Sequence, residues 1–159
     1  MLNSRIFSFV HESIALNKGK TFAKVLLRNL AKLPVYNIDS ADERKIHQAI
    51  VDLVKVINIV ADSKQTVLQK TFKDIVDGLF FDLYYSDHME EKNISIIKYV
   101  LQYLASHKSN FDDLQVFEKE KKIEQLYQKW THPDNEVRNR IKLFAVRSPD
   151  ILKPILESK

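Results

Sequence analysis

The sequence contains no cysteine, only two glycines among 159 residues, and no apolar run approaching the roughly 20 residues that a membrane-spanning helix needs. Without cysteine there is no disulfide scaffold, thiolate metal site or cysteine nucleophile, and the composition fits a reducing, cytoplasmic location. Two glycines exclude a glycine-built phosphate cradle such as GxGxxG or a P-loop. The N-terminus also lacks the features of a secretory signal.

What the sequence does contain is typical of helices. It is 45% hydrophobic and 29% charged, with only four prolines, and this combination favours a globular, mainly α protein. We expect a small mixed α/β element over residues 1–38 and a helical hairpin and bundle over residues 39–159. The stretch LNSRIFSFVHESIAL predicts a short amphipathic helix, and TFAKV at residues 21–25 predicts a strand.

The start of the second region is marked by Ser40 and Glu43, which have the spacing of a capping box. A long helix is expected to follow and to end near Asp62-Ser63. Its apolar residues form a heptad seam, which Ala49, Val54 and Val56 widen. The seam consists of Ile46, Ile50, Leu53, Ile57 and Val60.

A second long helix is predicted after a short break, so the two should form a helical hairpin. Its apolar stripe comprises Leu68, Phe72, Ile75, Val76, Leu79, Phe80 and Leu83. Further helices are expected over residues 94–105 and 111–130 and from near Glu136. Ser148-Pro149 resembles an N-cap followed by a first-turn proline, and predicts a short final helix.

No catalytic constellation is evident. The acidic cluster Asp87-His88-Met89-Glu90-Glu91 offers oxygen ligands to a divalent cation, but a solvated loop between helices explains it better. Asp112-Asp113 and the charged stretch at residues 118–121 are better explained by a solvent-facing helix than by a nuclease site. The aromatic run at residues 80–85 and the lone Trp130 are interpreted as core packing rather than as base-stacking surfaces.

The charge distribution gives the one functional signal in the residues themselves. The net charge is +4, and residues 1–40 carry six Lys and Arg against two acidic residues, whereas residues 41–159 carry 19 of each. An excess confined to one end of a chain indicates an anionic partner. A solvated basic face is the alternative explanation. The candidate DNA-contacting residues are Lys18, Lys20, Thr21, Lys24, Arg28 and Lys32.

Four stretches in order, LNSRIFSF, GKTFAKV, LAKLPV and IVDGLFFDLYY, resemble the C-terminal part of type II restriction–modification enzymes. These are adenine-specific DNA methyltransferases with a TaqI-like C-terminal specificity region, and the resemblance spans roughly residues 2–100. It implies that residues 1–38 end a DNA target-recognition module. The chain has no Pro-Pro, and so lacks the family's catalytic motif.

The resemblance therefore implies a non-catalytic piece that binds double-stranded DNA. The rest of the enzyme, its partner, would hold S-adenosylmethionine, and no cofactor is expected in this chain. A helical protein-interaction or assembly module without a nucleic-acid role is the alternative. The heptad seam in residues 46–60 motivates that alternative, because such seams also pair between chains in homo-oligomers.

Overall fold

The computed structural model describes residues 4–14, 35–62, 66–105 and 115–158, and they form helices and no strand. The mainly α prediction is confirmed, whereas the strand expected at residues 21–25 lies outside the described residues. The helices in chain order are α1 (Arg5–Ile14), α3 (Ala41–Asp62), α4 (Thr66–Tyr84), α5 (Ser86–Glu91), α6 (Ile97–Ala105), α7 (Val116–Thr131), α8 (Glu136–Arg147) and α9 (Leu152–Glu157).

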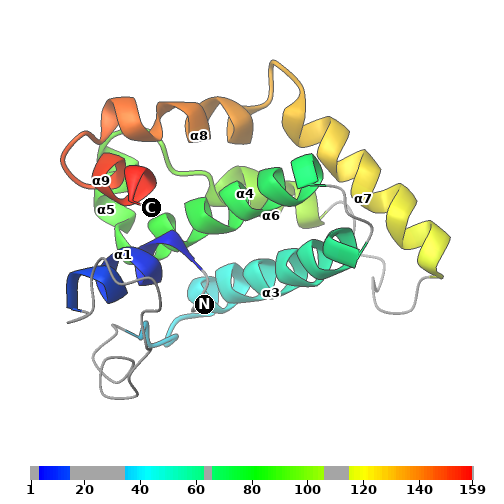
Figure 1. Ribbon diagram of the computed structural model, residues 1–159, viewed down its shortest axis with the longest axis horizontal. Coiled ribbons are helices and arrows are strands. Elements are labelled where there is room, and N and C mark those ends of the chain that lie inside the picture. Colours follow the sequence, from blue (N-terminus) through cyan, green and yellow to red (C-terminus); the bar gives the residue numbers. More distant parts are fainter. Residues whose placement is uncertain (1–3, 15–34, 63–65, 106–114, 159) are drawn as a thin grey trace, which may run out of the picture.

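Helix α4 is the centre of the bundle and packs against α1, α3, α5, α7 and α8. Figure 1 shows it in the middle, with α3 on one side and α8 on the other. Every residue from 75 to 83 is buried, although the sequence pattern predicted only a stripe. A helix that is buried on every face must have neighbouring elements on all sides. Here the neighbouring helices come from both halves of the chain.

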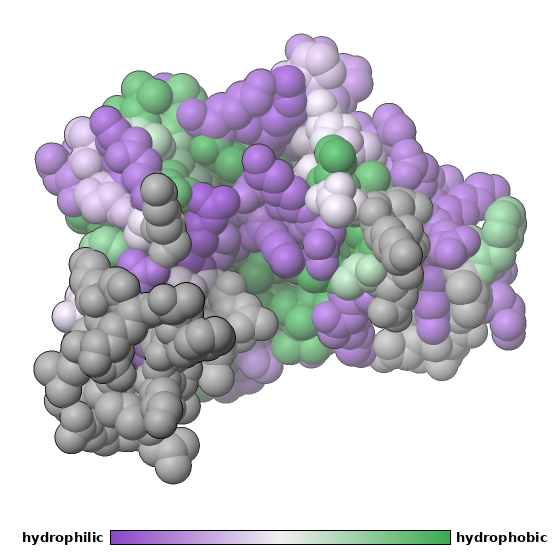
Figure 2. Space-filling model, in the orientation of Figure 1, coloured by the Kyte–Doolittle hydropathy of each residue, from purple (hydrophilic) through white to green (hydrophobic). Residues whose placement is uncertain are grey.

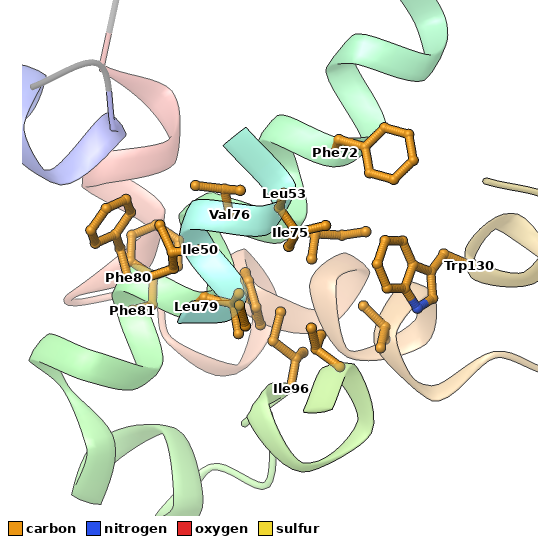
Figure 3. Close-up of a cluster of buried hydrophobic side chains, with 14 of the residues drawn as sticks. Ile50, Leu53, Phe72, Ile75, Val76, Leu79, Phe80, Phe81, Ile96 and Trp130 are labelled. Atoms are coloured by element: carbon orange, nitrogen blue, oxygen red, sulfur yellow. The ribbon is translucent and has the colours of Figure 1, made fainter. Parts of the chain in front are cut away.

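The hairpin of α3 and α4 is the most extensive helix–helix contact in the described part of the chain. Ile50, Leu53 and Val60 of the predicted seam are buried, and Ile46 and Ile57 are half-buried. Figure 3 shows Ile50 and Leu53 beside the apolar side chains of α4. The seam is thus used largely within the chain. Val54, which is expected to widen the seam, is instead 37% exposed and lines a depression beside α4.

One glycine sits where α4 meets its neighbours most closely. A Cβ at Gly78 would lie 2.6 Å from Ile96 Cδ1 and 3.2 Å from a ring carbon of Phe144. Ile96 precedes α6 and Phe144 belongs to α8, and both are fully buried. The glycine therefore permits the close approach of these two elements to α4.

Four local predictions need correction, and the first is the helix expected over residues 111–130, which begins at Val116 after the extended N-cap residue Gln115. The acidic cluster at residues 87–91 is part of α5 rather than a loop, with Met89 buried as its anchor. The helix expected from residue 94 begins at Ile97, because Asp82 of α4 accepts hydrogen bonds from the N–H groups of Ile96 and Ile97 at 2.9 and 2.8 Å. That carboxylate acts as a cap from another helix and fixes the start of α6.

The final helix begins at Leu152, not directly after Ser148 as predicted. Ser148 N–H still bonds Phe144 O at 3.0 Å, so Ser148 closes α8 instead. Its hydroxyl nevertheless accepts a hydrogen bond from Leu152 N–H at 3.0 Å. Ser148 therefore bonds to both helices, and it lies four residues before the start of α9.

Candidate nucleic-acid interface

All six residues predicted to contact DNA, Lys18, Lys20, Thr21, Lys24, Arg28 and Lys32, lie in residues 15–34, outside the described residues. We call residues 15–34 the basic segment. It holds five Lys and Arg and no acidic residue, whereas the rest of the chain holds 20 Lys and Arg against 21 Asp and Glu. The excess positive charge is therefore narrower than residues 1–40 and coincides with this segment.

The chain on both sides of the basic segment packs against one side chain at the end of α4. Phe7 of α1 meets the Tyr84 ring edge to face, with centroids 6.1 Å apart. Tyr36, just after the segment, meets the same ring at 5.5 Å, and its N–H donates to the Tyr84 hydroxyl at 3.2 Å. Phe7 is only 2% exposed. The stretches before and after the basic segment are thus held together at Tyr84, although they are far apart in sequence.

The exit from the basic segment is also fixed to the start of α3. The Tyr36 hydroxyl donates to Glu43 Oε1 at 2.7 Å, and Glu43 Oε2 accepts from Ser40 N–H at 2.7 Å. The Ser40 hydroxyl accepts from Glu43 N–H at 3.1 Å, so the predicted capping box is confirmed. The hydrogen bond from Ser40 N–H, and after it the hydrogen bond from the Tyr36 hydroxyl, lowers the pKa of Glu43 to about 2.

Arg5 is the only Lys or Arg of residues 1–40 outside the basic segment. It binds groups within the helical bundle. Its guanidinium lies 3.0 Å from Asp74 Oδ1 and 3.2 Å from Asp77 Oδ2. The backbone N–H of Arg5 donates to Asp77 Oδ1 at 3.0 Å, and the guanidinium Nη1 donates to Leu156 O at 3.2 Å. Arg5 therefore ties α1 to α4 and α9.

The carboxyl groups beside Arg5 are strongly affected by burial. Burial raises the pKa of Asp77 to about 6, even though hydrogen bonds and charge from Arg5 oppose the rise. Burial also raises the pKa of Asp74, opposed by the charges of Arg5 and Lys70. Burial outweighs the opposing charge of Arg5 at both carboxyls, and the nearby charge of Asp74 adds to the rise in the pKa of Asp77.

A second buried carboxyl organises the loop before α6. Burial raises the pKa of Asp82 to about 6, opposed by the bonds from Ile96 and Ile97 and by the charge of Arg140. Arg140 in turn donates to Asn93 O at 2.9 Å and to the Tyr99 hydroxyl at 3.0 Å. These groups hold α4, α6 and α8 together, and their roles are structural.

These buried acids were not predicted from the sequence. Asp77 and Asp82 stand in the run IVDGLFFDL, which is otherwise apolar apart from Gly78. A helix run apolar on all faces is expected to be buried, so an acid inside it should need a partner. That signal was available, but the partners, Arg5 and the N–H groups of residues 96 and 97, come from distant parts of the chain.

The other candidate sites are weakened by the structure. Among the described residues no group of three or more His, Cys, Asp and Glu could hold a metal ion. His88 of the acidic cluster instead bonds the Ser148 hydroxyl at 2.8 Å. Phe80, Phe81 and Trp130 are buried, which confirms the core interpretation. Within the described part of the chain, no helix combines the length and apolar character needed to cross a membrane.

Comparison with known proteins adds no relative: no family model, curated protein or solved structure matches this chain.

Proposed function

We propose that this chain is a DNA-binding helical domain in which the basic segment supplies the phosphate contacts and the helical bundle holds the segment in place. The observation that carries the proposal is the confinement of the charge excess to residues 15–34, since the rest of the chain has 20 Lys and Arg against 21 acidic residues. Phosphate contacts made by Lys and Arg dominate the affinity of DNA-binding proteins.

The anchoring at Tyr84 supports a functional role for the segment. Phe7 and Tyr36 lie on opposite sides of the segment in sequence and both contact this ring. Joining the flanks reduces the entropy that the chain loses when its cations are ordered on a ligand. Lys18, Lys20, Lys24, Arg28 and Lys32 then act as one unit, with the Thr21 hydroxyl as an additional donor.

The finer proposal is that this domain belongs to a restriction–modification DNA methyltransferase. The ordered resemblance of LNS, GKTF, LPV and IVDGLFFDLYY supports it. In this proposal the chain positions double-stranded DNA, and a separate methyltransferase portion binds S-adenosylmethionine and performs the chemistry. The coding region upstream tests the assignment: a methyltransferase core with an Asn-Pro-Pro-Tyr stretch supports it, and an unrelated gene contradicts it.

DNA binding is tested by fluorescence anisotropy with a labelled duplex over a series of salt concentrations. If all five cations neutralise phosphates, these contacts alone should contribute about −4 to −5 to the slope of log K against log salt. A variant with Lys18, Lys20, Lys24, Arg28 and Lys32 changed to Gln should lose most of this slope. Its folding is checked by circular dichroism and thermal melting.

The matched control replaces three exposed lysines of the bundle by Gln: Lys98, Lys121 and Lys153. This control variant should bind the duplex almost as the wild type does. Absence of duplex binding by the folded wild-type protein at low salt contradicts the proposal. So does a five-site variant that binds with the wild-type affinity and salt slope.

A further inference from the structure

Two depressions flank Asp74 along the first half of α4, which is only partly covered by neighbouring helices. The first has a volume of about 570 Å³ and lies between the start of α1, the second half of α3, and α4. The second, about 240 Å³, lies between α4, the end of α7, and α8. Asp74 lines both. Figure 2 shows hydrophilic side chains across the middle of the face in view, where Figure 1 places α4 between α8 and α3.

The cations lining these depressions are largely uncompensated. Lys70 and Lys73, three residues apart on α4, line the first, and Lys142 and Arg138 of α8 line the second. Among the described residues, no direct hydrogen bond or ion pair occupies the ammonium group of Lys70, Lys73 or Lys142, and only Lys70 acts through its charge on Asp74. Arg138 Nη1 donates to Pro133 O at 3.4 Å.

The acidic groups on this face do not cancel that charge, because they are already engaged. The Arg5 guanidinium lies within 3.2 Å of carboxylate oxygens of both Asp74 and Asp77. Counting Arg5, Lys70, Lys73, Arg138 and Lys142 against these two acids leaves the face with a formal charge of +3. The chain outside the basic segment is close to neutral as a whole, so this face is a local concentration of positive charge.

The first depression also holds a hydroxyl without a partner. Ser4 is only 4% exposed and lines the depression, and its Oγ has no hydrogen-bond partner among the described residues. A buried hydroxyl left unbonded is unfavourable. A phosphate oxygen entering the depression would accept this hydrogen bond and lie near the ammonium groups of the depression.

We propose that this face, made by Ser4, Lys70, Lys73, Arg138 and Lys142, is a second contact surface for the phosphate backbone of DNA. The inference deepens the proposed function and rests on it. DNA presents a row of phosphates, which suits cations distributed over two adjacent depressions. The bound duplex then contacts the basic segment and α4 together, and the bundle contributes directly to affinity.

The decisive variant carries Lys70→Gln, Lys73→Gln and Lys142→Gln. It removes three cations of this face and leaves the basic segment unchanged. We expect duplex affinity at low salt to fall at least tenfold and the magnitude of the salt slope to fall by about 2 to 3. The Lys98→Gln, Lys121→Gln, Lys153→Gln variant loses the same charge at exposed sites outside both depressions, and it should keep the wild-type slope.

A second variant, Ser4→Ala, separates the hydroxyl from the charges. It should lower affinity by a few-fold with an unchanged salt slope and without lowering the melting temperature, because the hydroxyl has no partner in the free protein. Wild-type binding together with a triple variant that matches the control overturns this inference and leaves the proposed function standing. No binding by wild type overturns both.

The class of anion is tested by competition. Unlabelled duplex should displace the labelled duplex far better than polyglutamate does at the same charge concentration. Equal displacement by polyglutamate would overturn the assignment to phosphate and identify an acidic-peptide surface instead.

Discussion

The hydroxyl of Tyr84 accepts a hydrogen bond from the backbone N–H of Tyr36 at 3.2 Å, and the two rings meet edge to face with centroids 5.5 Å apart. Phe7 packs on the same Tyr84 ring from α1. One side chain at the end of α4 therefore holds both approaches to the basic segment. In the proposed function, this contact links the stability of the bundle to the binding of DNA.

Replacing Tyr84 should separate its two contributions. Tyr84→Phe removes the acceptor for Tyr36 N–H but keeps the ring, and should lower the free energy of unfolding by about 1 kcal/mol. Tyr84→Ala also removes both edge-to-face contacts, so it should cost more and weaken duplex binding. Urea unfolding and anisotropy measure the two effects. Unchanged duplex affinity in folded Tyr84→Ala would show that anchoring at this ring is not needed for binding.

Removal of Arg5 should destabilise the protein through the acids that it leaves behind. Arg5→Gln leaves Asp77, which is 8% exposed, without its cation. We expect a loss of about 2 kcal/mol, less than for a fully buried pair because the Arg5 side chain is 38% exposed. The additional change Asp77→Asn should recover part of that loss.

The matched control for Arg5 is Lys45→Gln, which breaks an exposed pair with Asp42. It should change the free energy of unfolding by less than about 0.5 kcal/mol. Equal effects from Arg5→Gln and Lys45→Gln in urea unfolding would contradict a structural role for Arg5.

The two buried carboxyls predict how stability depends on pH. The pKa values of Asp77 and Asp82 are raised to about 6 in the folded protein, from 3.8. Between about pH 4 and pH 6 the folded state therefore keeps protons that the unfolded state has released. The free energy of unfolding should then fall as pH rises through this window and level off above it, by on the order of 2 kcal/mol for each carboxyl.

Asp82→Asn tests the pH prediction at one group. The amide oxygen can still accept from the N–H groups of Ile96 and Ile97, so the start of α6 is kept while the titration is removed. The decline of stability between pH 4 and pH 6 should become shallower, whereas Asp87→Asn at an exposed position should leave it unchanged. A decline of the same steepness in Asp82→Asn would contradict the raised pKa of Asp82.

The features that sequence alone predicted are those encoded by neighbouring residues. The Ser40 and Glu43 capping box was predicted because both of its partners lie within three residues of each other, and both hydrogen bonds are present. The α3–α4 hairpin followed in the same way from two apolar patterns separated by a short break. Local spacing is sufficient information for such features.

The missed features depend on contacts between distant residues. Nothing near Ile94 in sequence shows that the Asp82 carboxylate will delay the start of α6 to Ile97. Nothing near Ser148 shows that α8 will continue up to it. The basic surface beside α4 was missed for the same reason, since Lys70 and Lys142 belong to helices that only the tertiary fold brings together. Predicted contacts in the basic segment stay predictions.

The N-cap of α8 offers a local test of stability. The Asn135 side chain accepts from Val137 and Arg138 N–H at 2.9 and 3.2 Å and donates to the Tyr103 hydroxyl at 3.1 Å. Asn135→Ala should cost about 2 kcal/mol, at the upper end for a cap, because the side chain is buried. Asn135→Asp keeps the cap and should lose less. Urea unfolding that ranked Ala as stable as Asp would contradict this role.

Trp130 of α7 is the only tryptophan of the chain, and it packs on α4. Trp130 is 1% exposed and meets Phe72 edge to face, with centroids 5.7 Å apart (Figure 3). Its indole N–H is buried and has no acceptor among the described residues.

Trp130→Ala should cost about 3–5 kcal/mol through the cavity that it leaves. Trp130→Phe should cost much less, because it keeps an aromatic ring beside Phe72 and removes an unsatisfied donor. Emission from the folded wild type should be blue-shifted and should move to longer wavelength on unfolding in urea. The two variants lack tryptophan, so their unfolding in urea is followed by circular dichroism, and a Trp130→Phe variant as unstable as Trp130→Ala would contradict this prediction.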